Sequence, residues 1–260
     1  MSTERLIGRK DGAVGWLIFN NPERRNAVSL DMWEAIPHVL DDFAADGEVR
    51  VVVLTGAGDK AFVSGADISQ FEKERSTAET VARYDEIGER AQTRLKTFDK
   101  PLIAMIRGYC IGGGLNIAAS CDIRIAADDA RFGIPAAKMG LGYRAGSMKQ
   151  LVDIVGAAYA REIMITARQF SAAEALAIGL VHKVVPVMEL ETATRAYFDM
   201  IAANAPLTMR AAKRIIREVM KADYDAAACA AWVKECFASE DYAEGRRAFM
   251  EKRKPVFKGR

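Results

Sequence analysis

The chain has 260 residues, of which 50% are hydrophobic and 28% are charged, the composition of an ordinary soluble globular protein. Its 37 Lys and Arg residues nearly balance its 35 Asp and Glu residues, which argues against bulk nucleic-acid binding and against a polybasic membrane surface. No stretch has the apolar core of a signal peptide or the length of a membrane span, so we expect a cytoplasmic protein.

The first segments of the chain predict strands that alternate with helices. Residues 13–20 (AVGWLIFN) have the composition of a strand, and residues 30–46 place apolar side chains at helical spacing. The β-branched run at 49–58 (VRVVVLTGAG) ends in glycine and predicts a buried strand. A polar helical region is expected over residues 70–98.

The same alternation continues in the middle of the chain. Residues 100–111 (KPLIAMIRGYCI) predict a strand, residues 115–122 predict a helix, and residues 123–133 predict a strand followed by a turn. Repeated strand–helix units are typical of an α/β fold in which helices pack outside the sheets. We therefore expect a fold of the α/β class.

Beyond residue 144 the strand signal fades, and Ala-rich segments with apolar stripes predict helices over 205–222 and 225–253. We divide the chain into an α/β core over residues 1–200 and a helical C-terminal region over residues 201–260. A monomer would leave these stripes exposed, which favours a homo-oligomer.

The cysteines and histidines do not suggest a metal site. The cysteines have no closely spaced ligand pair and are expected to be small buried hydrophobes in a reducing compartment. They are Cys110, Cys121, Cys229 and Cys236. His38 lies on an amphipathic helix and His182 in a turn before a strand, so both are expected to be structural. We therefore expect no metal ion.

Three consecutive glycines, Gly112 to Gly114, separate an apolar run from a predicted helix. Glycine lets a ligand approach the backbone, and the unpaired amides of a helix start suit an anion or a developing oxyanion. A tight strand-to-helix turn explains the glycines equally well when they are taken alone. A second glycine turn at residues 62–69 (FVSGADIS) also follows a strand, and two such loops can each offer one N–H to the same carbonyl oxygen.

Several segments together resemble the crotonase (enoyl-CoA hydratase/isomerase) superfamily, in the order of that family and nearly from end to end. They are NPERRNAV (21–28), SGADI (64–68), KPLIAMIRGYCIGGGLNIAASCDIRIA (100–126), RFGIPAAKMGL (131–141), SAAEALAIGLVHKVVP (171–186) and SEDYAEGRRAFMEKRKPVFKG (239–259). The resemblance implies a spiral of ββα turns with a C-terminal helical region that builds homotrimers, often paired into hexamers. It also implies an acyl-CoA substrate from fatty acid metabolism, with no cofactor apart from the coenzyme A of that substrate.

The resemblance assigns an oxyanion hole to the backbone amides of Ala66 and Gly113, which would bind the thioester oxygen. It also assigns a group of residues to coenzyme A, with the last two reaching its nucleotide end, commonly from a neighbouring subunit. These residues are Arg25, Ala27, Asp67, Ile68, Phe249 and Lys252. Arg25 and Lys252 could equally be solvated surface charges. Many relatives have a lysine where this chain has Ser69.

The chain departs from the hydratases of this family at both catalytic glutamates. Asn116 and Ala136 stand at these positions, and neither can act as a general base at neutral pH. A reaction that generates its own carbanion needs no such base. Decarboxylation of a 2-carboxyacyl-CoA is such a reaction, since loss of CO₂ leaves the enolate for the protein to stabilise and protonate.

The loop GLGYRAG gives this lyase hypothesis its local support. Tyr143 matches a tyrosine of the methylmalonyl-CoA decarboxylases in the superfamily, and Arg144 could pair with a substrate carboxylate. A packed loop tyrosine and a surface arginine are the structural alternatives. These decarboxylases can carry a histidine where Ala66 stands, which counts against the match.

Two other functions stay open at the level of the sequence. The chain could be a hydratase or isomerase that uses another carboxylate, such as Asp67, Glu72 or Glu74. It could also be a coenzyme A-binding or scaffold protein without catalytic activity. The glycines of both loops and the Tyr143–Arg144 pair argue against this last alternative.

Overall fold

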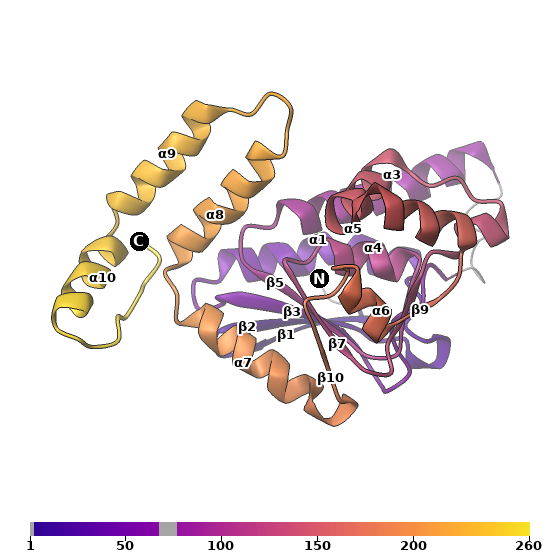
Figure 1. Cartoon of the computed structure of the whole chain (residues 1–260), viewed down its shortest axis with the longest axis horizontal. Coiled ribbons are helices and arrows are strands. Elements are labelled where there is room, and N and C mark those ends of the chain that lie inside the picture. Colours follow the sequence, from indigo (N-terminus) through magenta and orange to yellow (C-terminus); the bar gives the residue numbers. More distant parts are fainter. Residues whose placement is uncertain (1–2, 68–76) are drawn as a thin grey trace.

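The computed structural model describes residues 3–67 and 77–260, which form two sheets surrounded by helices (Figure 1). The larger sheet has the strand order β1–β2–β3–β5–β7–β10 and the smaller has the order β4–β6–β8–β9. The strands of the larger sheet are β1 Leu6–Asp11, β2 Val14–Phe19, β3 Val51–Gly56, β5 Leu102–Ile106, β7 Ile123–Ala127 and β10 Lys183–Val185. Those of the smaller sheet are β4 Ala61–Val63, β6 Tyr109–Ile111, β8 Arg131–Gly133 and β9 Phe170–Ser171.

Each repeat of the chain gives one strand to each sheet. β3, β5 and β7 are parallel neighbours in the larger sheet, and β4, β6 and β8, which follow them in the sequence, are parallel neighbours in the smaller sheet. Two strands and a following helix therefore form one turn of a spiral. The predicted α/β fold built of ββα turns is confirmed.

The helices described within residues 3–67 and 77–202 cover the two sheets. They are α1 Leu30–Ala45, α3 Ala78–Thr97, α4 Gly113–Ala119, α5 Ala145–Thr166, α6 Ala172–Ala177 and α7 Leu190–Ala202. Short 3₁₀ turns lie at Pro22–Arg24, Pro135–Met139 and Val187–Glu189. The main core packs α1, α3, α4 and α5 against the sheets. A second apolar cluster packs α7 against the other face of the larger sheet, where Trp16 meets Phe198 edge to face.

The C-terminal helices are α8 Pro206–Val219, α9 Ala226–Phe237 and α10 Glu240–Met250, and Figure 1 shows them beside the sheets rather than on them. The predicted single helix over 225–253 is wrong, because Ser239 begins a new helix and its side chain accepts a hydrogen bond from the Tyr242 amide. The tail returns to the body of the protein. Arg50 donates to the Phe257 carbonyl at 3.2 Å, and the buried Asp241 carboxylate accepts the amide hydrogen of Gly259.

β1 and β9 were not predicted, whereas β10 directly follows His182, where a strand was expected. β9 is only two residues long, which is too short to show a strand pattern. β1 has the sequence LIGRKD, and its last four residues are exposed. It pairs with β2 at the edge of the larger sheet.

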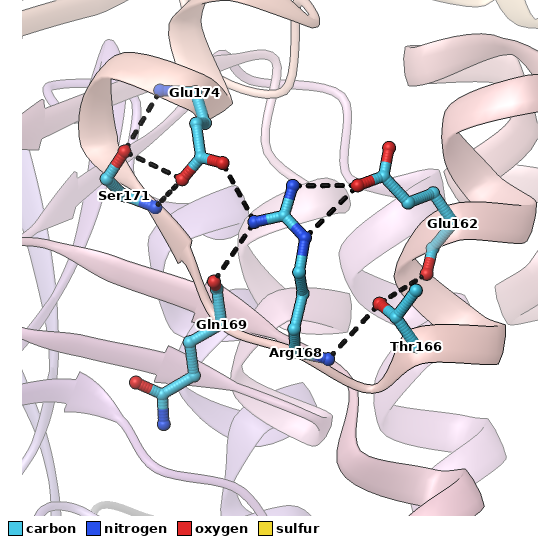
Figure 2. Close-up of polar contacts among 6 residues, drawn as sticks. All are labelled: Glu162, Thr166, Arg168, Gln169, Ser171 and Glu174. Atoms are coloured by element: carbon cyan, nitrogen blue, oxygen red, sulfur yellow. Dashed lines mark hydrogen bonds and ion pairs between the residues drawn. The ribbon is translucent and has the colours of Figure 1, made fainter.

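Four side chains, which we call the Arg168 cluster, join the end of α5 to the start of α6: Glu162, Arg168, Ser171 and Glu174. The Arg168 guanidinium binds Glu162 at 2.7 Å and Glu174 at 2.8 Å (Figure 2). Ser171 and Glu174 cap α6 reciprocally, since each side chain accepts the backbone N–H of the other. The cluster encloses β9, which pairs with β8. It therefore connects this edge strand of the smaller sheet to the helices on either side of it in the sequence.

Candidate active site

Each of the three consecutive glycines has its own structural reason. Gly112 has φ of 55°, in the region that favours glycine, and its N–H donates to the Gly133 carbonyl of β8 at 2.8 Å. A Cβ on Gly114 would lie 2.1 Å from the Val63 carbonyl oxygen, so only glycine lets α4 pack directly on β4. Gly113 lies between them as the first residue of α4, where a helix amide has no intrahelical acceptor.

The second glycine loop runs beside Val28, two residues before α1 begins. Gly65 has φ of 119°, and its carbonyl accepts the Val28 amide at 2.8 Å. The Asp67 amide donates to Val28 at 3.0 Å, so Ala66 is held between two backbone hydrogen bonds. This local bridge to residue 28 fixes the direction of the Ala66 amide.

The two loops converge. A Cβ placed on Gly113 would lie 3.8 Å from the Ala66 nitrogen. In the part of the chain that the structure describes, neither amide donates to a backbone or side-chain acceptor. Two unpaired N–H groups at one point are what a thioester oxygen needs when it takes up negative charge.

A cavity of about 380 Å³ opens at this point. The 3₁₀ turn 135–139 and the loop 140–144 form one wall, and α1, α3 and α4 form the others. The four residues predicted to be catalytic all line the cavity: Ala66, Gly113, Asn116 and Tyr143. Ala136 and Arg144 line it as well. The structure therefore brings together the predicted reaction centre.

The cavity is poor in ionisable groups. Arg144 is its one charged lining residue among those the structure describes, and no Asp, Glu, His or Lys lines it there. Ala136 is 5% exposed and Asn116 is half-buried, so both positions of the missing glutamates face the reaction centre with uncharged side chains. The described wall offers no carboxylate for proton transfer.

Tyr143 lies against this wall with its hydroxyl shielded from solvent. The hydroxyl has no hydrogen-bond partner within the described residues. Burial raises the pKa of Tyr143 above its usual value, and the nearby Asn116 amide lowers that pKa in part, although the two groups fall outside hydrogen-bond geometry. The phenol therefore stays protonated at neutral pH and can act as a donor.

Arg144 differs from the expectation of a free cation. It precedes α5, and its guanidinium forms an ion pair with the Asp85 carboxylate of α3 and donates to the Asp85 carbonyl at 3.2 Å. The pair ties the loop 140–144 to α3 across the cavity wall. The charge of Arg144 is thus already balanced within the chain.

The residues assigned to coenzyme A fall into two groups. Arg25 and Ala27 lie in the turn beside the Ala66 loop, since the Ser64 amide donates to the Arg25 carbonyl at 3.1 Å. Arg25 stacks over the Tyr109 ring. Asp67 is buried and forms an ion pair with Arg24 at 3.1 Å. Arg25, Ala27 and Asp67 are not among the described residues that line the cavity. Ile68, Ser69, Glu72 and Glu74 lie outside the described residues.

Phe249 and Lys252 lie in and after α10, away from the cavity. Phe249 is 83% exposed and Lys252 is exposed with φ of 54°. The single chain does not bring them to the reaction centre. Their predicted role therefore depends on a neighbouring copy of the chain.

The sequence analysis missed the residues that α1 and α3 contribute. Trp33 lies beside the glycine turn, its ring 3.7 Å from the position of a Cβ on Gly113. Tyr84, Gly88 and Gln92 line the cavity from successive turns of α3. A glycine within a predicted helix is a signal for close packing or an open space, and Gly88 is such a glycine.

Comparison with known proteins identifies the family. The family model described as enoyl-CoA hydratase/isomerase matches residues 9–260. The chain belongs to the enoyl-CoA hydratase/isomerase family. This agrees with the resemblance noted in the sequence, and the family has an acyl-CoA thioester as its substrate class.

Proteins with hydratase names are similar to the chain over its whole length. A short-chain-enoyl-CoA hydratase of Clostridium acetobutylicum is 39% identical over 98% of this chain and 97% of that protein. A crotonyl-CoA hydratase of Syntrophomonas wolfei is 35% identical over 99% of both chains. The crystal structure of an enoyl-CoA hydratase/carnithine racemase from Magnetospirillum magneticum superposes with a TM-score of 0.93 at 36% identity, covering 100% of this chain and 97% of that one.

The described residues contain neither a candidate metal cluster nor a helix suited to a membrane. No cluster of three or more His, Cys, Asp or Glu side chains that could hold a metal ion occurs within residues 3–67 and 77–260. No described helix is both long and apolar enough to cross a membrane.

Proposed function

We propose that the protein binds an acyl-CoA thioester and stabilises the enolate of its acyl group with the Ala66 and Gly113 amides. The convergence of these two unpaired N–H groups on one cavity is the observation that carries the proposal. Removing one such donor typically slows an enzyme by about 10²–10³-fold. Membership of the enoyl-CoA hydratase/isomerase family supports the thioester as the substrate class.

We further propose that the reaction is decarboxylation of a 2-carboxyacyl-CoA. The bond between the α-carbon and the carboxylate breaks, and its electron pair enters the enolate that the two amides stabilise. The α-carbon then takes up a proton, for which we propose the protonated Tyr143 hydroxyl of the cavity lining as the donor. The uncharged side chains of Asn116 and Ala136 support this reaction, because a carboxylate at either position would repel that of the substrate.

Incubation with a panel of thioesters tests the proposal. We expect loss of CO₂ from methylmalonyl-CoA or ethylmalonyl-CoA and little hydration of crotonyl-CoA. Mass spectrometry of the thioester products measures both reactions. Efficient hydration with no decarboxylation would contradict the lyase proposal. Absence of turnover with every thioester would favour a binding or scaffold protein instead.

Hydration is the second candidate, and the names of the relatives favour it. It needs an acid and a base, and loss of one positioned group typically costs about 10²–10⁴-fold. The double variant Asn116→Glu with Ala136→Glu is therefore expected to raise crotonyl-CoA hydration well above that of the unmodified protein. Efficient hydration before any substitution would mean that other carboxylates supply the proton transfers.

We propose a cytoplasmic homotrimer or a dimer of trimers that requires no separate cofactor. In it, the adenine end of coenzyme A would lie near Arg25 and contact Phe249 and Lys252 of a neighbouring copy. The exposure of Phe249 and the distance of α10 from the cavity in the single chain support this arrangement. Calorimetry with acetyl-CoA and light scattering test the binding and the assembly separately.

A further inference from the structure

A second cavity, of about 300 Å³, lies where the C-terminal tail returns to the body of the protein. It is lined by the end of α1 and the turn after it, the end of α3 and the residues that follow, the start of α8, and the tail residues Lys258 and Gly259. It shares no described lining residue with the cavity that holds the Ala66 and Gly113 amides. Its volume is at the lower end of the range for small-molecule sites. We call it the tail cavity.

Basic side chains dominate the lining of the tail cavity. The described lining contains five cationic residues and one carboxylate: Arg50, Arg94, Lys100, Arg210, Lys258 and Asp99. The carboxylate of Asp99 is already paired, since it accepts from Arg214 at 3.0 Å. Two of the arginines, Arg94 and Arg210, each bind a carboxylate that lies outside the lining. Three cations of the lining remain to be explained.

These three cations are bound only by neutral groups. No carboxylate among the described residues lies within ion-pair distance of Arg50, Lys100 or Lys258. Arg50 donates to the Phe257 carbonyl at 3.2 Å, and the Lys100 ammonium donates to two carbonyls at the C-terminal end of α1, each at 2.6 Å. A guanidinium has five N–H donors and an ammonium three, so both residues keep donors for a ligand. Lys258 is exposed in the tail.

The like charges of Arg50 and Lys100 act on each other. Burial lowers the pKa of Lys100, the Asp46 carboxylate raises it in part, and the Arg50 charge lowers it again. The Asp46 carboxylate is itself bound by Lys10 at 3.0 Å. The start of α8 adds partial positive charge, because the N–H groups of a first helical turn have no intrahelical acceptor. An anion in the tail cavity would relieve this repulsion.

We propose that the tail cavity binds a phosphate group, carried by the free ion or by a small phosphate monoester. Arg50 and Lys100 of the body and Lys258 of the tail bind its oxygens. A phosphate balances more of the three charges than a monocarboxylate does, and its oxygens accept several charge-assisted hydrogen bonds at once. A Cβ on Gly259 would lie 3.4 Å from the Arg50 guanidinium, so the tail passes directly beside this cation. The bound anion therefore joins the tail to the body.

Calorimetry and thermal unfolding with inorganic phosphate test the proposal. At constant ionic strength and a phosphate concentration ten times the dissociation constant, we expect the melting temperature to rise by about 3–6 °C. Acetate at the same concentration should raise it less, because acetate carries a single charge. Glycerol 3-phosphate is the second probe. Tighter binding than that of inorganic phosphate would assign a phosphate monoester, and weaker binding would assign the free ion.

A substitution that supplies its own carboxylate tests the location. Gly47 lines the tail cavity, and a Cβ there would meet nothing within 4 Å. Gly47→Asp should raise the melting temperature without phosphate and abolish the further rise with phosphate. The neutral isostere Gly47→Asn should keep the wild-type response. Equal responses of the wild-type protein and Gly47→Asp, as a general salt effect would produce, would overturn the proposal.

Matched variants of the tail test the contribution of Lys258. Lys258→Gln should weaken phosphate binding about tenfold, because it removes one charge-assisted hydrogen bond. Lys254→Gln changes an exposed lysine of the same tail outside the lining and should keep the wild-type affinity. Neither variant should change the affinity for acetyl-CoA. A joint loss of phosphate and acetyl-CoA binding in Lys258→Gln would overturn the assignment of a separate site. Absence of phosphate and glycerol 3-phosphate binding by the wild-type protein would overturn the proposal, whatever the protein does with thioesters.

Discussion

Gly113 and Gly114 lack a side chain for opposite reasons. A Cβ on Gly113 would have only ordinary contacts, the nearest at 3.7 Å, and it would lie beside the Ala66 amide. A Cβ on Gly114 would overlap the backbone of β4 at 2.1 Å. The first glycine therefore leaves the space beside the Ala66 amide open, whereas the second lets the helix pack against β4.

Alanine substitutions distinguish these two roles. Gly113→Ala should fold with an almost unchanged melting temperature but lose about 10²–10³-fold in kcat/KM, because its methyl group occupies the oxyanion site. Gly114→Ala should lower the free energy of unfolding by about 1–3 kcal/mol, as overpacked core positions do. Gly142→Ala, in open space on the cavity wall, is the control for both. A fully active Gly113→Ala enzyme would contradict the assignment of the oxyanion hole.

The cavity also predicts the pH dependence of turnover. The described lining residues include no His, Cys, Lys, Asp or Glu, and burial raises the pKa of Tyr143 further above its usual value. We expect kcat/KM to be flat between about pH 6 and 9. The raised pKa means that the folded protein keeps the phenol proton, so this contribution to stability is lost only as the pH rises above the value of a free tyrosine. A bell-shaped profile would show that an acid and a base outside the described lining take part.

Part of the site could be predicted from sequence because it depends on backbone shape. The glycines that shape the two loops leave a visible pattern, whereas Asn116, Ala136 and Tyr143 were assigned from the resemblance to the family. Gln92 has no such pattern. Its contact with Ser120 joins α3 to α4, and only the packing of two helices brings them together.

At the scale of elements, α3 forms a wall of the cavity, and we expect this wall to limit the length of the acyl chain. Gly88 lies in the middle of this helix and lines the cavity, and a Cβ there would meet nothing within 4 Å. Gly88→Leu should therefore fold, and it should stabilise the helix by about 0.5–1 kcal/mol through its higher helix propensity. Its side chain should weaken the binding of hexanoyl-CoA more than that of acetyl-CoA in calorimetry. Ala82→Leu, at an exposed position of the same helix, should change neither affinity; equal weakening of both thioesters by Gly88→Leu would contradict this wall.

The Arg168 cluster joins α5 to α6, so its loss should weaken the packing of both helices. Arg168→Ala should lower the midpoint of denaturant unfolding more than Arg195→Ala, because the partners described for Arg195, Glu191 and Phe198, lie on its own helix. Equal shifts in the two variants would contradict a joining role.

The same cluster predicts a contribution to acid stability. Hydrogen bonds from Ser171 and the Arg168 guanidinium lower the pKa of Glu174 to about 2. This contribution is complete above the ordinary glutamate value and is lost as the pH falls from there toward 2. Unfolding measured between pH 5 and 2 should be less pH-dependent in Glu174→Gln. A wild-type slope in that variant would contradict the prediction.

At the scale of the whole molecule, the α/β class and the helical C-terminus were predictable, whereas the edges of the sheets were not. Buried strands such as β3 and β5 are continuous apolar runs. β1 is mostly exposed at an edge, and β9 has two residues, so neither shows a strand pattern. The break before α10 could have been predicted from the sequence, since Ser239 is followed by two acidic residues, a pattern typical of the first turn of a helix.

The C-terminal helices predict the assembly. Large apolar side chains there are exposed in the single chain, among them Ile216, Phe237, Phe249 and Met250. We expect light scattering to give three times the 28.5 kDa mass of one chain, or twice that trimer. Phe249→Glu should shift the protein toward smaller species and weaken its binding of coenzyme A. Met188→Glu, at an exposed position outside α8–α10, should leave the mass unchanged, and a monomeric wild-type protein would contradict the shared coenzyme A site.

The direct backbone contact between α4 and β4 has an evolutionary consequence. Gly114 sets the separation of the Ala66 and Gly113 amides through main-chain packing alone, so this separation does not depend on the side chains at positions 116 and 136. On the proposed function, we expect substitutions at those two positions to leave thioester binding intact. A lineage could then exchange one enolate reaction for another through two codons, with every intermediate still able to bind its substrate.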